Sequence, residues 1–138
     1  MKIVKAYPPN IETIRAKFTL RPTVIFTYGD TIYNPIGGKI TEDLMVHEQT
    51  HEKQQGDDPA GWWDKYLVDA DFRLSQEVEA YRNQYQCYLE TKCIKNGKLR
   101  RVRLSKFLKK ISTDLASPIY GNIVTVKEAR ELIADFSN

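Results

Sequence analysis

The sequence predicts an α+β fold, in which a small antiparallel sheet or hairpin packs on one helix and three or four further helices surround them. Two observations carry this prediction. Residues 23–33 form a β-branched and aromatic run broken by one turn signal, whereas apolar residues recur at helical spacing through much of the remaining chain. The 138 residues are 41% apolar and 28% charged, which suits a single modest core. We therefore expect one domain over residues 1–138.

The composition argues against several classes of protein. No stretch approaches the roughly 20 consecutive apolar residues of a membrane span, so we expect no membrane partner. The first ten residues lack the apolar core of a secretory signal, and we expect a cytoplasmic protein. Cys87 and Cys93 lie six positions apart, which suits neither a metal pair nor a redox pair. We interpret them as reduced thiols, with a disulfide as the alternative.

The first predicted elements are a short helix and a hairpin. Asn10 is expected to cap a helix that reaches about Phe18. Residues 23–28 and 31–33 are rich in β-branched and aromatic side chains, and Gly29-Asp30 between them is a turn signal. This segment therefore predicts two antiparallel strands.

A helix is predicted from about Thr41 to Gly56. Thr41 is a favourable N-cap, and Glu42 and Asp43 place negative charge in the first turn, where it stabilises the helix dipole. Residues 57–59, Asp-Asp-Pro, cannot continue the helix. The helix is therefore expected to end near Gly56.

An aromatic cluster, Trp62, Trp63 and Tyr66, precedes a second long helix that contains residues 72–85. Such a cluster more often forms core that fixes the angle between two helices than a substrate pocket. We therefore leave these three residues out of the predicted site.

Two further helices are predicted near the C-terminus. Asn96-Gly97 marks a turn before the first of them, Ser117-Pro118 ends it, and residues 126–136 form the second. Their inward positions are expected to be Leu104, Leu108, Ile111, Leu115, Ala129, Leu132, Ile133 and Phe136.

The net charge of +3 arises in the C-terminal half. Residues 1–69 carry 8 basic and 10 acidic side chains, whereas residues 70–138 carry 13 basic and 8 acidic ones. Nine of the basic residues lie between Lys92 and Lys110, where there is no acid. Such a segment can bind phosphates, but it is also typical of the solvated face of an amphipathic helix. We favour the solvated face and keep an anionic partner as the alternative.

Residues 47–51, His-Glu-Gln-Thr-His, carry the chemistry. Residues four apart lie on the same face of a helix, so His47 and His51 can present two imidazoles to one metal ion. Glu48 beside them is positioned to act as a general base. These are the only two histidines of the chain, which favours a zinc site over two ordinary helix-surface histidines.

A zinc site needs a third protein ligand, and Glu77 and Glu79 are the candidates. Glu77 falls at the margin of the apolar stripe formed by residues 74, 78, 81 and 85, whereas Glu79 points to the opposite side. A carboxylate near the core must find a partner, because burying an unpaired charge is costly. We therefore predict Glu77 as the ligand and keep an ion pair of Glu77 with Arg73 as the alternative.

These residues resemble the gluzincins, a metallopeptidase group with two histidines on one helix and a ligand glutamate on the next. Many gluzincins place this glutamate three residues before an alanine, as Glu77 stands before Ala80, whereas thermolysin-like members place it directly before, which would select Glu79. The chain is more closely similar to small zincin-like proteins of tailed bacteriophages and bacteria. That similarity covers roughly residues 7–90 and rests on residues 28–35 and 47–55, Trp62-Trp63 with Tyr66, and residues 77–81.

The resemblance implies a minimal zincin-like fold and a zinc-dependent peptide-bond hydrolase. Zn²⁺ would be held by His47, His51 and Glu77, and Glu48 would take a proton from the metal-bound water. The expected partner is a protein or peptide substrate, paired along one strand of the hairpin, in the cytoplasm of a bacterial host if the protein is phage-encoded. An ordinary hairpin without substrate contact is the alternative.

One departure from the gluzincin pattern concerns the support of the ligands. Many gluzincins place an aspartate or asparagine four residues after the ligand glutamate, where it orients a histidine, but Tyr81 stands there in this chain. Tyr81, Tyr120 or an arginine could stabilise the oxyanion, and the sequence does not choose among them. The alternative function is an inactive or structural zinc-binding domain that acts through a protein or nucleic-acid partner at residues 92–110.

Overall fold

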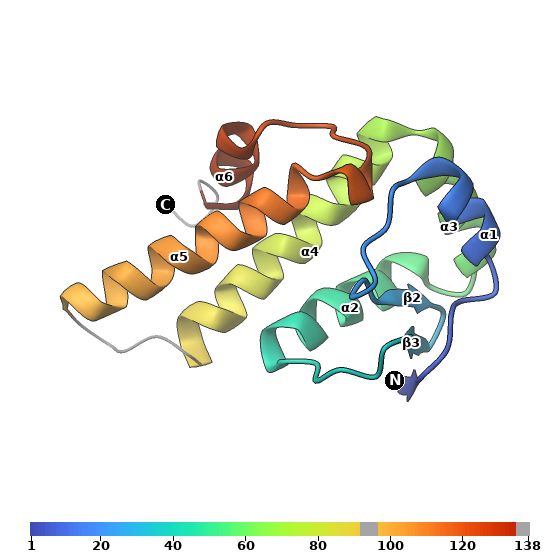
Figure 1. The fold of residues 1–138 in the computed structure, drawn as a ribbon, viewed down its shortest axis with the longest axis horizontal. Coiled ribbons are helices and arrows are strands. Elements are labelled where there is room, and N and C mark those ends of the chain that lie inside the picture. Colours follow the sequence, from blue (N-terminus) through green and yellow to red (C-terminus); the bar gives the residue numbers. More distant parts are fainter. Residues whose placement is uncertain (92–96, 135–138) are drawn as a thin grey trace.

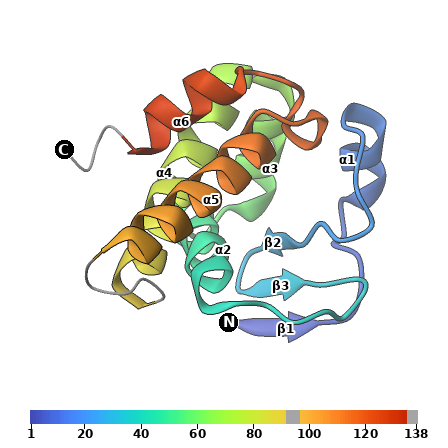
Figure 2. The same cartoon turned by 60° about the vertical axis from the view of Figure 1, so that its left-hand side comes forward.

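A computed structural model describes residues 1–91 and 97–134, and within these ranges the chain has an α+β fold with six α-helices and one three-stranded sheet (Figures 1 and 2). The elements in chain order are β1 (Lys2–Val4), α1 (Ile11–Lys17), β2 (Phe26–Tyr28), β3 (Thr31–Tyr33), α2 (Glu42–Gln55), α3 (Pro59–Val68), α4 (Ala70–Thr91), α5 (Lys98–Leu115), the 3-10 helix η1 (Pro118–Tyr120) and α6 (Val126–Ala134).

The sheet has the strand order β1-β3-β2. The predicted hairpin is confirmed, with Thr27 opposite Ile32 in an antiparallel pair, although its first strand begins at Phe26. The sheet is mixed, because it contains a third strand that the sequence did not predict: β1 pairs with β3 in parallel, with Ile3 opposite Ile32. A three-residue strand is too short to show alternation, and its central residue Ile3 is exposed, so no sequence pattern marks it.

The hairpin is joined to the end of α2 by one side chain. Gln55 donates Nε2–H to the Thr27 carbonyl at 2.8 Å, and its Oε1 accepts from the Gly29 N–H at 2.7 Å. Gly29 has φ of 63°, a turn conformation that glycine adopts without strain. Trp63 Nε1–H donates to the same Thr27 carbonyl at 3.0 Å, so α3 also holds the hairpin.

Helix α2 lies between the sheet and α4, as Figure 2 shows. Its limits agree with the prediction, with Thr41 at the N-cap and Gly56 at the C-cap with φ of 56°. Its buried side chains are all polar, which is unusual for a central helix and requires that each of them find partners. They are Asp43, His47, Glu48, Thr50, His51 and Gln55.

Among the described residues, most of the buried apolar side chains form two clusters. The first, which we call the C-terminal core, joins α4, α5 and α6 and contains Val78, Tyr81, Tyr85, Phe107, Leu108, Ile111, Leu115, Ala129 and Ile133. The second, the aromatic core, joins α1, β2 and α3 and contains Ile14, Phe18, Phe26, Trp62, Trp63, Tyr66 and Leu67. Tyr120 of η1 packs against both clusters.

The predicted C-terminal helices are observed as α5 and α6, and Leu108, Ile111, Leu115, Ala129 and Ile133 are buried as expected. The prediction for Phe136 and the predictions that involve Cys93 and residues 92–96 lie outside the described residues. Cys87 is a free cysteine. In residues 1–91 and 97–134, no helix has both the length and the apolar character required to span a membrane.

Candidate metal centre

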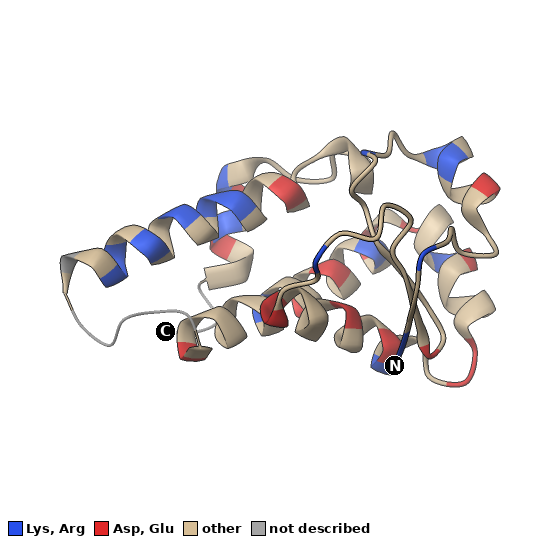
Figure 3. Ribbon diagram, turned by 60° about the horizontal axis from the view of Figure 1, so that its bottom comes forward, with Lys and Arg blue, Asp and Glu red and all other residues tan. Residues whose placement is uncertain are grey.

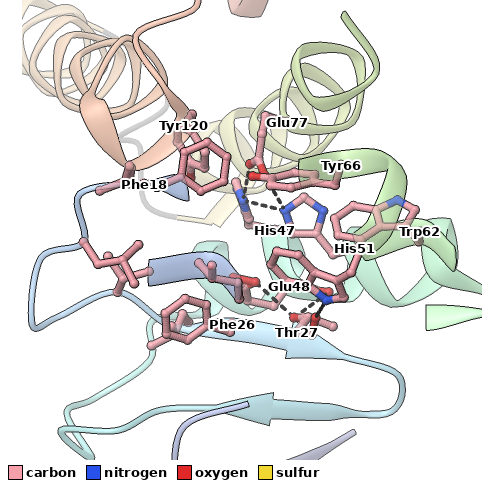
Figure 4. A pocket seen from close by; sticks show the side chains of 16 residues that line it. Phe18, Phe26, Thr27, His47, Glu48, His51, Trp62, Tyr66, Glu77 and Tyr120 are labelled. Atoms are coloured by element: carbon pink, nitrogen blue, oxygen red, sulfur yellow. Dashed lines mark hydrogen bonds and ion pairs between the residues drawn. The ribbon is translucent and has the colours of Figure 1, made fainter. Parts of the chain in front are cut away.

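The structure brings His47 and His51 of α2 against Glu77 of α4 (Figure 4). His47 Nε2 lies 3.3 Å from Glu77 Oε1, and His51 Nε2 lies 3.3 Å from Glu77 Oε2. The two Nε2 atoms are 3.2 Å apart. All three residues are buried, with relative exposures of 3%, 6% and 2%. These atoms thus form one compact donor cluster below the protein surface.

Two glutamines fix which imidazole nitrogens face the cluster. His47 Nδ1 lies 3.0 Å from Gln84 Oε1, and His51 Nδ1 lies 2.8 Å from Gln54 Oε1. An amide oxygen only accepts hydrogen bonds, so both Nδ1 atoms carry a hydrogen. Each Nε2 is therefore the nitrogen available to a metal ion or to an exchangeable proton.

The orientation of both glutamine amides is set in turn by acceptors. Gln84 donates Nε2–H to Asp43 Oδ2 at 2.9 Å. Gln54 donates Nε2–H to the Gln76 carbonyl at 3.0 Å and to Glu79 Oε1 at 2.9 Å. Because carboxylate and carbonyl oxygens cannot donate, the amide nitrogens must face them, and the Oε1 atoms must face the histidines.

Glu77 is held on one oxygen only. The Tyr66 hydroxyl donates to Glu77 Oε2 at 2.6 Å, whereas the buried Oε1 accepts no hydrogen bond from any described residue. Arg73 is buried nearby but donates to the carbonyls of Tyr66, at 2.6 Å, and Tyr120, at 2.9 Å. The ion pair of Glu77 with Arg73 is therefore not what the structure shows, and Oε1 is an orphaned acceptor that faces His47.

The donor set fits a zinc ion. Ligand atoms about 2.0–2.1 Å from a tetrahedral zinc lie about 3.3 Å from one another. The separation of the two Nε2 atoms, 3.2 Å, and that of each Nε2 from its nearest carboxylate oxygen, 3.3 Å from His47 to Oε1 and 3.3 Å from His51 to Oε2, have this size. One ligand atom from each of the three residues lies within 4.8 Å of the other two, and each carboxylate oxygen lies beside one histidine, so both oxygens are near enough to face the ion. A cavity of about 50 Å³ adjoins His47, His51 and Glu77. Since one water needs about 10–15 Å³ of such volume, the cavity has room for a few waters beside the donors.

The charges of the cluster follow from its burial and its contacts. Burial opposes charge on Glu77, but His51 and His47 hold the pKa of Glu77 well below its usual range. Burial also opposes charge on His51, but Glu77 prevails and raises the pKa of His51 to about 9. In the absence of a metal, these shifts favour an ionised Glu77 carboxylate beside a protonated His51. Binding of a metal cation would displace that proton.

A second buried carboxylate, Glu48, lines the same cavity without belonging to the donor cluster. Thr27 Oγ1–H donates to Glu48 Oε2 at 3.1 Å, which orients the carboxylate (Figure 4). Burial raises the pKa of Glu48, although His47 and His51 oppose the shift. Its place in the cavity, together with this upward shift, suits the Glu48 carboxyl group to proton exchange with a ligand there.

Tyr81 and Tyr120 meet beside the histidines. Their hydroxyl oxygens are 2.8 Å apart, and the Tyr81 ring packs edge-on against the His47 ring with centroids 4.4 Å apart. Burial raises the pKa of both phenols well above the usual value, so both keep their protons. Tyr120 lines the cavity and can offer a hydrogen bond to a ligand there.

No protein-family model, curated protein or solved structure matches this chain.

The sequence prediction and the structure agree on the placement of the main residues. His47, His51, Glu77 and Glu48 surround one cavity, whereas Glu79 is exposed. Glu79 nevertheless contacts Gln54, so it is less independent of the site than the sequence indicates. The sequence left open which residues orient the histidines, and the structure places Gln84 and Gln54 in that position.

Four residues of the site were not found from the sequence. They are Thr27, Gln54, Tyr66 and Gln84. The aromatic cluster forms core as expected, and its three residues also line the cavity; the Tyr66 hydroxyl in addition donates to Glu77. Gln84 follows Glu77 by seven residues, two turns along the same helix face, and that spacing could have identified it.

Proposed function

We propose that this protein is a gluzincin-like zinc metallopeptidase. One observation carries the proposal: a buried His47–His51–Glu77 donor cluster, with an orphaned oxygen, shares a cavity with a second buried carboxylate that is not a donor. A purely structural zinc site is closed by four protein ligands, whereas a catalytic site keeps one position open. Among the described residues the cluster has three ligands, which supports the catalytic alternative.

When bound, zinc would polarise a peptide carbonyl and lower the pKa of water near it. The remaining chemistry belongs to the chain. Glu48 takes a proton from the attacking water and passes it to the departing amine nitrogen, while Thr27 holds its carboxylate in place. Tyr120, which keeps its phenolic proton, is placed to donate to the oxygen on which negative charge develops.

The proposed substrate is a protein or peptide in an extended conformation. Strand β2 is an edge of the sheet, and Thr27 and Ile25 both line the cavity. An edge strand can pair with a peptide backbone, which gives affinity with little dependence on side chains. Because Gln55 and Trp63 already occupy the Thr27 carbonyl, we place such pairing on the residues before Thr27.

The test is the substitution Glu48→Gln, with Glu52→Gln on the same helix as a matched control. Glu48→Gln is expected to retain zinc and lose hydrolysis by a factor of about 100 or more, the usual contribution of general base catalysis. Glu52→Gln is expected to keep both properties. Hydrolysis is measured on a peptide library and zinc by elemental analysis after dialysis. Wild-type cleavage by Glu48→Gln would contradict the proposed role.

A second candidate function is a zinc-binding domain without hydrolytic activity. The small size of the cavity beside the cluster and the lining by Ile14 and Phe18 favour this alternative, because a substrate must reach a covered site. Such a domain would act through a protein or nucleic-acid partner, for which the basic residues of the 92–110 segment are the candidates. It would bind zinc and leave every peptide of a library intact.

A further inference from the structure

A groove of about 280 Å³ lies beside the cavity of about 50 Å³ at the candidate metal centre. His47 and Glu48 line both of them. One side of the groove is formed by residues 21–25, which precede β2, and the other by α5 and η1. Tyr120 lines both the groove and the cavity. The groove therefore adjoins the candidate metal centre, and its lining can contact a ligand that extends from that centre. Its charged lining residues, apart from His47 and Glu48, are Arg21, Lys110 and Asp114.

Arg21, Lys110 and Asp114 form an ionic cluster with two positive charges and one negative charge. Arg21 donates from Nη1 and Nη2 to Asp114 Oδ1, each at 3.3 Å. Lys110 Nζ lies 3.7 Å from the other oxygen, Asp114 Oδ2. Two cations thus share one carboxylate, which leaves a local charge of +1. The Arg21 and Lys110 side chains are 53% and 69% exposed, so both can reorient toward an incoming ligand.

The surrounding charge has the same sign. Helix α5 carries seven basic residues and one acidic residue, Asp114. Figure 3 shows these basic residues along the length of the helix, whereas most acidic residues lie on other elements. A surface of one charge raises the local concentration of oppositely charged ligands. An acidic ligand is therefore attracted toward the helix that forms one side of the groove.

We propose that this groove selects peptide substrates that carry an acidic side chain, which pairs with Arg21 and Lys110. The inference rests on the proposed peptidase function and names its substrate class. A carboxylate can accept hydrogen bonds from the forked donors of arginine. Asp114 already does so, with one oxygen that accepts from both Arg21 nitrogens and the other oxygen beside Lys110. The incoming carboxylate competes with Asp114 for the same two cations.

The test compares peptides that differ only in charge. A set of alanine-based decapeptides carries one glutamate or one glutamine at each position in turn. For the wild type, kcat/KM is expected to be about two- to fivefold higher for glutamate at the favoured position, the range for partly exposed ion pairs. Because both peptides undergo the same chemical step, their ratio removes any effect on catalysis itself.

Variants that remove either the positive charges or the negative charge of this ionic cluster are expected to change the ratio in opposite directions. The double variant Arg21→Gln/Lys110→Gln is expected to bring the ratio near one. Asp114→Asn is expected to raise it above the wild-type value, because both cations lose their internal partner. Lys127→Gln, an exposed lysine of α6 that does not line the groove, is the matched control and is expected to keep the wild-type ratio. Thermal unfolding verifies that each variant is folded.

The outcomes separate this inference from the proposed function. Equal cleavage of glutamate and glutamine peptides by an active wild type would overturn the inference and leave the peptidase function standing. If the wild type cleaves no peptide, the proposed function fails, and binding of the same peptides to zinc-loaded Glu48→Gln decides the inference. Tighter binding of glutamate peptides that is lost with Arg21→Gln/Lys110→Gln supports it, and equal or absent binding overturns it.

Discussion

Tyr66 of α3 donates a hydrogen bond of 2.6 Å to Glu77 of α4, on the oxygen that faces His51. Burial and the nearby Glu77 charge raise the pKa of Tyr66 well above its usual value, so the phenol remains the donor. Its own position is fixed by Trp62, which stacks on the Tyr66 ring with centroids 4.8 Å apart. The aromatic core thus controls the orientation of a candidate metal ligand.

The first prediction concerns this hydrogen bond. Tyr66→Phe removes the hydroxyl that donates to Glu77 while keeping the aromatic packing. Zinc affinity is expected to fall about 10- to 100-fold, the usual effect of losing a partner behind a metal ligand. Competition with a fluorescent chelator measures the affinity. Tyr33→Phe in β3 is the control and is expected to bind zinc as the wild type does; equal affinity for both variants would refute the role of Tyr66.

The second prediction separates the two glutamates of α4. The wild type is expected to bind about one zinc per chain, Glu77→Ala none after dialysis, and Glu79→Ala about one. Glu77 lies in the donor cluster, whereas Glu79 touches only Gln54 behind His51. A modest loss of affinity in Glu79→Ala is therefore expected. Elemental analysis gives the stoichiometry, and circular dichroism verifies that each variant is folded.

Zinc binding should also appear as stabilisation. A ligand present at about 100 times its Kd adds about 2.7 kcal/mol to the free energy of unfolding. The wild-type melting temperature is therefore expected to rise on addition of zinc and to return on chelation, whereas that of Glu77→Ala stays constant. A folded wild type that neither retains zinc nor shifts its melting temperature would leave the two histidines as ordinary buried side chains.

The residues that the sequence predicted correctly are those whose position depends on their own helix. The spacing of His47 and His51 fixes their common face, and Thr41 and Gly56 mark the ends of α2 through local backbone effects. The burial of Glu77 followed from its place on the stripe of α4. Each of these conclusions uses only neighbours within a few turns.

The residues that were missed depend on contacts between elements. Tyr66 reaches Glu77 from another helix, and Thr27 reaches Glu48 from a strand, so neither contact leaves a periodic pattern. Strand β1 is defined by its parallel pairing with β3, which is distant in the chain. Arg21 and Asp114, 93 residues apart, meet only in the folded protein. A single sequence does not show which residues that are distant in the chain come into contact.

The fourth prediction concerns pH and the start of α6. The Thr125 N–H donates to Glu128 Oε1 at 3.0 Å, and the Glu128 N–H donates to Thr125 Oγ1 at 3.1 Å, which forms a capping box. These bonds lower the pKa of Glu128. A lowered carboxyl pKa stabilises the fold above the unfolded value of about 4.5, and this contribution disappears as pH falls through the folded value.

Glu128→Gln keeps the side-chain acceptor but removes the charge. The wild type is therefore expected to be more stable than Glu128→Gln at pH 7, and the difference is expected to vanish under acid. Urea unfolding of both proteins across this pH range measures it. Glu131→Gln on the same helix is the control. A stability difference between the wild type and Glu128→Gln that does not depend on pH would contradict the proposed contribution of the Glu128 charge to the capping box.

The last prediction tests the link between the hairpin and Glu48, the proposed general base. Gln55→Leu removes one of the two donors to the Thr27 carbonyl, which keeps Trp63, and the acceptor of the Gly29 N–H. Gln55 is buried, so little water can replace its amide. An unsatisfied buried polar group costs about 1–3 kcal/mol, so the free energy of unfolding is expected to fall by that amount. Urea denaturation measures it, with Gln49→Leu, exposed on α2, as the control.

The same substitution should also affect turnover more than zinc binding. Thr27 carries both the carbonyl held by Gln55 and the hydroxyl that orients Glu48, so loosening β2 displaces the general base. His47, His51 and Glu77 lie on α2 and α4 and keep their own supports in Gln84, Gln54 and Tyr66. Gln55→Leu is therefore expected to lower kcat while one zinc stays bound. Parallel loss of zinc would mean that the hairpin supports the metal ligands themselves.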